Sequence, residues 1–217
     1  MNYLVLSVGA VVAYLIGSVP TAVWYGKAFH GIDVREYGSG NSGATNSFRV
    51  LGKSAGFIVM VVDLFKGFLP TQAAVYLINA GLINDPDLIF YQSTFGIAAV
   101  LGHIFPVYAG FKGGKGIATL FGMILSIHVE AAFIVALIFF IVLLISKYVS
   151  LGSMLGALAF PLVLLMPRFY PDEPFLIAFG FVVFFIVVIT HQKNIVRLLN
   201  GEENKAKIRI RKKRDLE

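Results

Sequence analysis

The chain has 217 residues, of which 58% are hydrophobic and only 14% are charged, and its mean hydropathy is +0.82. This composition excludes an ordinary soluble domain and is typical of a protein embedded in a bilayer. The formal net charge is +6 and there is no cysteine, which excludes disulfides, thiolate metal sites and a cysteine nucleophile. Because no polar stretch is long enough to bury its own core, we predict one membrane domain over 1–200 and a basic cytoplasmic tail over 201–217.

The spanning helices are predicted from apolar runs, each compared with the roughly 20 residues that a crossing needs. The N-terminal run lacks the basic start of a cleavable signal peptide, so we interpret it as the first helix. Seven helices are predicted, although the run over 116–129 is short and could be re-entrant, which leaves five or six crossings as alternatives. The runs cover about residues 4–25, 56–80, 89–110, 116–129, 131–147, 151–168 and 174–190.

Basic residues distinguish the two ends of this predicted bundle. Of the 18 Lys and Arg residues, 16 fall in alternate junctions, namely 26–55, 110–115, Lys147 and the tail from residue 193 onward. Cytoplasmic loops are enriched in Lys and Arg. We therefore predict an all-α integral membrane protein, a compact bundle of seven transmembrane helices with the N-terminus outside and the C-terminus cytoplasmic. The positive charge then indicates contact with anionic lipid headgroups, not with nucleic acid.

Three polar clusters fall on the predicted cytoplasmic face, as one site built from several loops would require. The first is GSGNSGATNSFR at 38–49, the second is GFKGGKG at 110–116, and the third is HQKN at 191–194. Glycine backbones can turn several N–H groups toward one point, and Ser, Asn and Arg add further donors. We interpret the first cluster as an anion cradle for phosphate in which Ser39, Gly40, Asn41 and Arg49 take part.

The other two clusters fit the same purpose. Lys112 and Lys115 stand among four glycines and favour anion binding, with a tight turn carrying positive-inside lysines as the alternative. His191 and Asn194 share a helical face at i, i+3, so both can approach one ligand. The alternative for His191 is an interfacial polar residue beside the lipid headgroups.

Other functional patterns are excluded or weak. GSGNSG matches GxGxxG literally, but its flanks are spanning helices and not a βαβ unit, and the second cluster fails the P-loop spacing. No cytoplasmic set of carboxylates or closely spaced histidines supports a metal site. We expect no metal and no cofactor.

Polar residues inside the spans have structural interpretations. Asp63 and Lys66 lie at i, i+3, and charges at membrane depth are costly unless they are paired, so a structural ion pair is favoured. His103 could lie near the site or serve packing. The Gly152 and Gly156 spacing is compatible with close helix packing, and Ser153 could face the site.

The chain resembles the bacterial acyl-phosphate-dependent glycerol-3-phosphate acyltransferases, the PlsY family. The resemblance extends over nearly the whole chain through ordered motifs: GSVPTA, GSGNSGATNSFRVLGKSAG, DLFKG, LGHIFPVYAGFKGGKGIAT, KYVSLGS and HQKNIVRLLNGEE. It implies an acyltransferase that moves a fatty acyl group from acyl phosphate to the primary hydroxyl of glycerol 3-phosphate. The products would be lysophosphatidic acid and phosphate, in phospholipid biosynthesis at the bacterial plasma membrane, without metal or nucleotide.

The resemblance also implies which residues act. Ser39, Asn41, Arg49, Lys115, Ser153, His191 and Asn194 match the family's functional positions. We expect Ser39, His191 and Asn194 at the catalytic centre and the others, with Gly40 and Lys112, on phosphate. The proton acceptor is either His191 or a substrate phosphate, and we favour the phosphate. The enzyme is expected to work as a monomer with membrane lipids around it.

Two other classes of function are weighed against the enzyme. A transporter for a phosphorylated metabolite would need internal repeats with broken helices at mid-membrane, and no convincing repeat is present. A lipid-binding scaffold would act through its basic tail alone. Deletion of the residues after Gly201 separates these possibilities, since an enzyme is expected to keep its activity.

Overall fold

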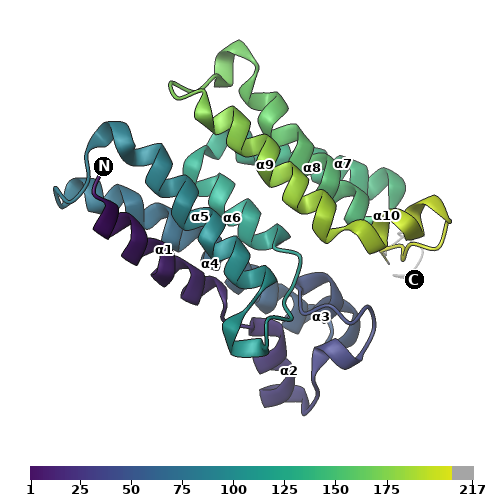
Figure 1. Cartoon of the computed structure of the whole chain (residues 1–217). Coiled ribbons are helices and arrows are strands. Elements are labelled where there is room, and N and C mark those ends of the chain that lie inside the picture. The colour runs from purple at the N-terminus through teal and green to yellow at the C-terminus, as the bar shows by residue number, and fades with distance from the viewer. Residues whose placement is uncertain (207–217) are drawn as a thin grey trace, which may run out of the picture.

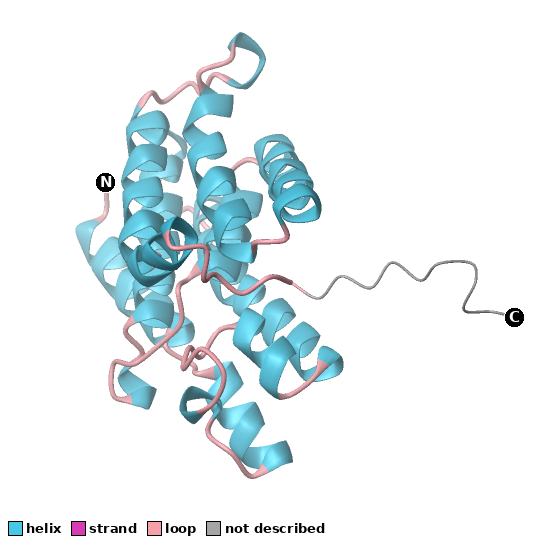
Figure 2. Ribbon diagram, turned by 90° about the vertical axis from the view of Figure 1, so that its right-hand side faces the viewer, coloured by secondary structure: helices cyan, strands magenta, loops and turns pink. Residues whose placement is uncertain are grey.

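The computed structural model describes residues 1–206 as helices joined by loops, and within that range it contains no strand (Figure 2). The all-α prediction is therefore confirmed. The elements are α1 (Tyr3–Gly17), α2 (Thr21–His30), η1 (Val34–Glu36), α3 (Ala44–Val50), α4 (Lys53–Asn79), η2 (Asp85–Asp87), α5 (Leu88–Ile104), η3 (Val107–Ala109), α6 (Ile117–Ile127), α7 (Val129–Ser146), α8 (Val149–Leu164), η4 (Pro167–Phe169), α9 (Phe175–Thr190) and α10 (Gln192–Leu199), where η marks a short 3₁₀ turn.

The six predicted apolar runs from 56–80 onward each correspond to one helix, in the order α4, α5, α6, α7, α8 and α9, and the first run contains α1 and the start of α2. Within residues 1–206, four segments are long and apolar enough to cross a membrane: Tyr3–His30, Lys53–Asn79, Leu88–Ala109 and Val129–Ser146. A fifth is formed if α9 and α10, which meet at 65°, are taken as one broken span, while α6 and α8 are shorter apolar helices. Seven crossings and the orientation of the termini stay predictions.

Glycines allow the helices to cross closely. A Cβ atom on Gly67 of α4 would lie 1.9 Å from the Thr119 carbonyl oxygen of α6, and one on Gly122 would lie 2.0 Å from the Leu64 oxygen. Gly17 of α1 is equally close to the backbone of α5. Since lipid is as apolar as the helix surfaces, such backbone contact is the main source of helix association in a bilayer. Gly152 and Gly156 of α8 pack against α7, which fits the packing interpretation of that spacing.

The first apolar run, predicted as one helix over 4–25, is divided into α1 and α2. The prediction was wrong here because Pro20 has no N–H to continue the helical bonding and its ring disfavours helical backbone at Val19. The interruption leaves carbonyl groups without helical partners inside the bundle. At Val19 the carbonyl oxygen accepts a hydrogen bond from the buried side chain of Lys66.

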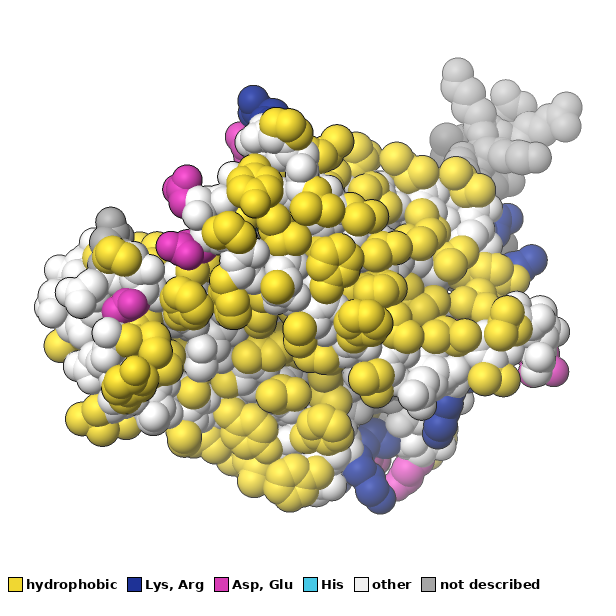
Figure 3. Space-filling model, turned by 45° about the horizontal axis from the view of Figure 1, so that its top comes forward, with side chains coloured by type: hydrophobic (Ala, Val, Ile, Leu, Met, Phe, Trp, Pro, Cys, Tyr) yellow, Lys and Arg dark blue, Asp and Glu magenta, His cyan; other side chains and the backbone are white. Residues whose placement is uncertain are grey.

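The loops that carry the three predicted clusters lie at the same end of the bundle. In Figure 1, α2, α3, α10 and the α5–α6 connection are at the lower right, whereas the N-terminus, the α4–α5 turn and the α8–α9 connection are at the upper left. The end of the bundle formed by α2, α3, α10 and the α5–α6 connection is called the loop end below. On the face drawn in Figure 3, hydrophobic side chains cover the middle, acidic side chains gather toward the opposite end and most Lys and Arg lie at the loop end.

Candidate active site at the loop end

The Gly38–Arg49 segment is a folded support and not a loose loop. The buried Asn46 side chain holds it: Oδ1 accepts from the Ser39 N–H at 2.9 Å, and Nδ2 donates to the carbonyl groups of Val34 and Tyr37, both at 3.0 Å. Oδ1 of Asn41 accepts from the Gly43 N–H at 2.9 Å. The segment therefore presents Ser39 in a defined position at the surface, and Asn46, which sequence reasoning did not single out, shapes it.

The glycines of the second cluster are explained by close packing. Gly113 and Gly114 donate from their N–H groups to the Ile104 and His103 carbonyls, both at 3.1 Å, so the chain folds back over the end of α5. A Cβ atom on Gly114 would lie 2.1 Å from Nε2 of His103. These two glycines let the chain pack against α5 and so bring Lys115 to the end of the bundle. Their predicted role in anion binding stays a prediction.

Lys115 meets the third cluster directly. Its ammonium donates to Oδ1 of Asn194, at the start of α10. Nδ2 of Asn194 in turn donates to Oε1 of Glu203 at 2.8 Å. Two of the predicted site residues from distant loops are thus joined, and the orientation of the Asn194 amide is fixed from both sides.

Glu203 is the residue that sequence reasoning missed. Besides Asn194 it accepts from Ser150 Oγ of α8 at 3.1 Å and from Arg197 Nε at 2.9 Å, and its side chain is only 7% exposed. The available signal was a pair of carboxylates, Glu202 and Glu203, just after a helix in which Asn194 and Arg197 lie at i, i+3. It was assigned instead to a tail beginning at residue 201.

The tail boundary therefore changes. Residues 202–206 return to the bundle, where the Ala206 N–H also donates to the Lys147 carbonyl at 2.7 Å. The expectation that the chain after Gly201 is dispensable conflicts with the contacts of Glu203. Most of the basic stretch KAKIRIRKKR, from residue 207 onward, lies outside the described residues.

His191 occupies the bend between α9 and α10 and is 2% exposed. Its Nδ1 lies 2.8 Å from the Val187 carbonyl oxygen. Because a carbonyl can only accept, Nδ1 carries the proton and Nε2 is left as an acceptor. Burial and the nearby charge of Lys115 lower the pKa of His191, so the ring is neutral near pH 7.

Lys115 is also electrostatically unusual. Burial is the main cause that lowers its pKa below the ordinary value, the charges of Arg197 and Arg49 act in the same direction, and Glu203 opposes them. Arg49 is exposed in the last turn of α3, and its charge is one of those that act on Lys115. Three loops thus bring cationic groups and neutral donors together in one place.

The other predicted residues lie around this centre. Ser153 is buried and its Oγ donates to the Val149 carbonyl of its own helix at 2.9 Å, one turn from the Ser150 that contacts Glu203. Gly40 and Lys112 line a neighbouring groove of about 340 Å³ together with Asp33, Arg35, Glu36 and Gly113. The structure therefore joins Lys115, His191 and Asn194 most closely, and places Gly40 with Lys112 beside them.

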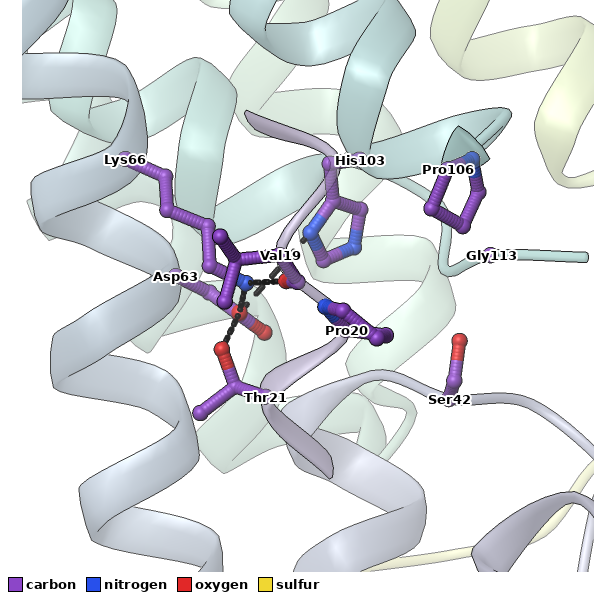
Figure 4. Close-up of a pocket in the computed structure, with 9 residues that line it drawn as sticks. All are labelled: Val19, Pro20, Thr21, Ser42, Asp63, Lys66, His103, Pro106 and Gly113. Atoms are coloured by element: carbon purple, nitrogen blue, oxygen red, sulfur yellow. Dashed lines mark hydrogen bonds and ion pairs between the residues drawn. The ribbon is translucent and has the colours of Figure 1, made fainter. Parts of the chain in front are cut away.

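A second polar cluster lies deeper, where α4 and α5 meet the α1–α2 break (Figure 4). Lys66 Nζ lies 2.6 Å from Asp63 Oδ1 and also donates to the Val19 carbonyl, while Thr21 Oγ1 donates to Asp63 at 3.1 Å. His103 Nδ1 is 3.8 Å from the same carboxylate oxygen. The predicted ion pair is confirmed. The adjoining cavity of about 10 Å³ is too small for a substrate, so the cluster is structural.

Within residues 1–206, no three His, Cys, Asp or Glu side chains form a group that could hold a metal ion. The expectations of no metal and no cofactor stay predictions. The functional groups of the site are an ammonium, guanidinium groups, amides, hydroxyls, one imidazole and the Glu203 carboxylate.

Known proteins share this sequence and fold. A family model described as glycerol-3-phosphate acyltransferase matches residues 7–201. The chain belongs to the glycerol-3-phosphate acyltransferase family. It is 42% identical over 217 residues to the glycerol-3-phosphate acyltransferase of Chlorobaculum tepidum, covering 90% of this chain and 94% of the relative. It is also 42% identical over 200 residues to that of Staphylococcus haemolyticus, covering 91% and 96%.

Solved structures agree with this assignment. The crystal structure of PlsY, an integral membrane glycerol 3-phosphate acyltransferase in its glycerol 3-phosphate form, superposes with a TM-score of 0.81 at 34% identity, covering 93% of this chain and 95% of that one. Its lysophosphatidic acid form gives 0.78 at 32% identity, covering 92% and 94%. The protein is therefore a PlsY-type glycerol-3-phosphate acyltransferase, an integral membrane enzyme of phospholipid synthesis.

Proposed function

We propose that this acyltransferase takes its acyl group from a fatty acyl phosphate and places it on the primary hydroxyl of glycerol 3-phosphate, giving lysophosphatidic acid and inorganic phosphate. The observation that carries the proposal is the meeting of Lys115, Asn194 and His191, with Arg49 nearby, at one end of an apolar bundle. Two of the reactants and both products carry phosphate groups, so gathered positive charge is what such a reaction needs. The crystal structures of the PlsY relative are a glycerol 3-phosphate form and a lysophosphatidic acid form, which supports the acceptor and product.

The residues divide between two phosphates. Arg49 and Lys115 hold phosphate oxygens, while Ser39, Asn41 and the backbone N–H of Gly40 orient them, with Lys112 beside the Gly40 groove. His191 and Asn194 position glycerol 3-phosphate. Ser153 contributes to substrate binding from α8, one helical turn from the Ser150 that contacts Glu203. The acyl chain of the donor lies along the apolar surfaces of the helices. A membrane protein has such surfaces already and does not need a separate cavity for the chain.

The reaction itself needs little from the protein beyond alignment. The hydroxyl oxygen of glycerol 3-phosphate attacks the acyl carbonyl carbon, the bond from that carbon to the phosphate oxygen breaks, and phosphate leaves with the electron pair. The hydroxyl proton passes to a phosphate oxygen. His191 is a weak base because its pKa is lowered, and its Nε2 accepts the hydroxyl hydrogen bond and holds the nucleophile in line.

The proposed setting follows the charge distribution. On the face drawn in Figure 3 most Lys and Arg lie at the loop end, and cytoplasmic loops are rich in Lys and Arg. We infer that this end faces the cytoplasm at the bacterial plasma membrane, that the bundle crosses the bilayer seven times, and that one chain is sufficient for activity.

The donor is tested with purified protein in detergent or vesicles, without added metal or nucleotide. Given an acyl phosphate and glycerol 3-phosphate, it is expected to release phosphate and form lysophosphatidic acid in equal amounts. Acyl-CoA in place of acyl phosphate is expected to give no product. Turnover with acyl-CoA alone would overturn the proposed donor.

The role of His191 is tested by His191→Gln, which keeps some hydrogen bonding and cannot take up a proton. The substitution is expected to raise KM for glycerol 3-phosphate more than it lowers kcat. A loss of kcat with unchanged substrate binding would instead make His191 the proton acceptor.

A further inference from the structure

Arg35 connects two loops of the site, although neither the motifs nor the proposed mechanism uses it. It lies in η1, immediately before the Gly38–Arg49 segment. Its Nη1 donates to the Ala109 carbonyl of η3 at 2.9 Å, across 74 residues of chain. Ala109 directly precedes the GFKGGKG cluster. One guanidinium therefore connects the segments that lead into the first and second clusters of the site.

The Arg35 guanidinium is held rigidly by a neighbouring carboxylate. Nε lies 3.0 Å from Asp33 Oδ1 and Nη2 lies 2.8 Å from Asp33 Oδ2, a two-point contact that fixes the plane of the group. The hydrogen bonds from Arg35 hold the pKa of Asp33 well below its usual range, so the carboxylate stays ionised at physiological pH. The side chain of Asp33 is 11% exposed and that of Arg35 is 26% exposed.

The hydrogen bond from Arg35 is made to the carbonyl at the start of the turn that carries Lys112. The Ala109 carbonyl also accepts from the Lys112 N–H at 3.4 Å, so Arg35 bonds to the carbonyl at the base of that turn. Farther along, Gly113 and Gly114 are fixed to the end of α5. The turn is consequently held at both sides, by Arg35 at its beginning and by α5 at its end, before the chain reaches Lys115.

We propose that Arg35 is a positioning residue of the acyltransferase site, which fixes the turn carrying Lys112 and Lys115 against the loop carrying Ser39 and Asn41. The identity of the anions rests on the proposed function. The link itself, which we call the brace, consists of the hydrogen bonds from Arg35 to Asp33 and to the Ala109 carbonyl. The groove shared by Arg35, Gly40, Lys112 and Gly113 lies along the contact between the two loops. Without the brace, the cationic groups lose their fixed spacing.

Lys27 provides a matched control. Its Nζ contacts the same Asp33 carboxylate at 3.4 Å, and its side chain is 58% exposed. Among the described residues its ion pair is with Asp33, while the bond to Ala109 comes from Arg35. Lys27→Gln thus removes a positive charge beside Asp33 and leaves the link between the two loops intact.

The first measurement is amide hydrogen exchange in the full-length protein, compared among the wild type, Arg35→Gln, Arg35→Lys and Lys27→Gln. Arg35→Gln is expected to speed exchange over Lys112–Lys115 by about tenfold, the order expected for losing a hydrogen bond from a charged group. Arg35→Lys keeps the charge but has no fork to reach Asp33 and Ala109 together, so it should act in the same direction. Exchange near the α7–α8 turn should stay unchanged, which excludes general unfolding.

The second measurement is kinetic. Arg35→Gln is expected to lower kcat/KM by about tenfold or more, and Lys27→Gln by less than about twofold. Lys115 is half-buried against Asn194 and is acted on by the charges of Glu203, Arg197 and Arg49, and a loosened turn lets more water reach it. Its pKa then rises, so the alkaline fall of the rate should move to higher pH in Arg35→Gln only.

The other outcomes overturn the proposal. If Arg35→Gln leaves amide exchange unchanged but raises KM, Arg35 is a direct ligand of the substrate. If both exchange and kinetics are unchanged, Arg35 does not position the turn. If the wild type does not transfer acyl groups from acyl phosphate, the proposed function fails. The exchange comparison would still decide whether Arg35 holds the turn.

Discussion

The Lys115 ammonium donates to the side-chain oxygen of Asn194, and this contact joins residues 79 positions apart in the sequence. Asn194 passes the interaction on, since its amide nitrogen donates to Glu203. The Lys115 ammonium, the Asn194 amide and the Glu203 carboxylate are thus connected by consecutive hydrogen bonds. Glu203 compensates part of the positive charge when no phosphate is bound, and its contacts set the orientation of Asn194.

Glu203→Gln is expected to lower kcat/KM by roughly 10- to 100-fold, because the contacts it weakens are hydrogen bonds to a charged group, each about 1.5–3 kcal/mol. Asn194 and Arg197 lose the carboxylate that orients them. Steady-state kinetics with both substrates provide the measurement. Glu202→Gln, at an exposed neighbouring position, is the control and should behave as the wild type. Equal effects of the two substitutions would mean that Glu203 acts only through net charge.

Activity is expected to decline on the alkaline side at a lower pH than an ordinary lysine would cause. The pKa of Lys115 is lowered by burial, so the positive charge is complete below that pKa and is lost as pH rises through it. The decline should be seen as a rising KM for glycerol 3-phosphate. Lys115→Arg, whose guanidinium stays charged, should remove this pH dependence even if its absolute activity is lower. An identical alkaline limb in both proteins would assign the titration to another group.

Two truncations are expected to behave differently. A chain ending at Gly201 lacks Glu203 and should lose most of its activity, whereas a chain ending at Ala206 keeps every contact of Glu203 and should retain it. Both variants lack the basic residues after 206 and so share any loss of lipid attraction. Acyl transfer is measured together with the amount of protein recovered in membranes. Retained activity in the shorter chain would show that Glu203 is dispensable.

Asp63→Asn is expected to destabilise the fold by about 3–5 kcal/mol, because it leaves the buried Lys66 ammonium without its carboxylate. The double substitution Asp63→Asn with Lys66→Met removes the unpaired charge and should recover part of the loss. Thermal unfolding in detergent gives the comparison. If the single and double variants melt together, the pair contributes little, and the Val19 carbonyl alone accounts for the position of Lys66.

Sequence reasoning predicted most of the fold because apolar runs of near-spanning length have one stable form in a bilayer. The helices from α4 to α9 follow the predicted runs. The break at Pro20 was missed although a proline inside an apolar run is itself a signal for one, whereas the hydrogen bond from Lys66 to the Val19 carbonyl could not be predicted. Such a contact is a property of the packed bundle and leaves no local pattern.

The site was predicted in part for a similar reason. Lys115, His191 and Asn194 stand in polar clusters that are unusual beside apolar helices, and the structure brings them together. Glu203 is surrounded by charged residues that read as a solvated tail, so its burial could not be deduced. Gly113 and Gly114 suggested anion binding or a tight turn, while the atoms that leave no room for a side chain on them include those of His103 and Ile104 at the end of α5.

Glu203 also sets the order in which a working enzyme can arise during synthesis. Chains are made and folded from the N-terminus, and the proposed site combines Ser39 near the beginning with Glu203 near the end. Every apolar helix is therefore inserted before the last carboxylate reaches Asn194. A chain that stalls before Glu203 can occupy the membrane without acting on lipid precursors there, so catalysis is expected only after synthesis has passed this residue.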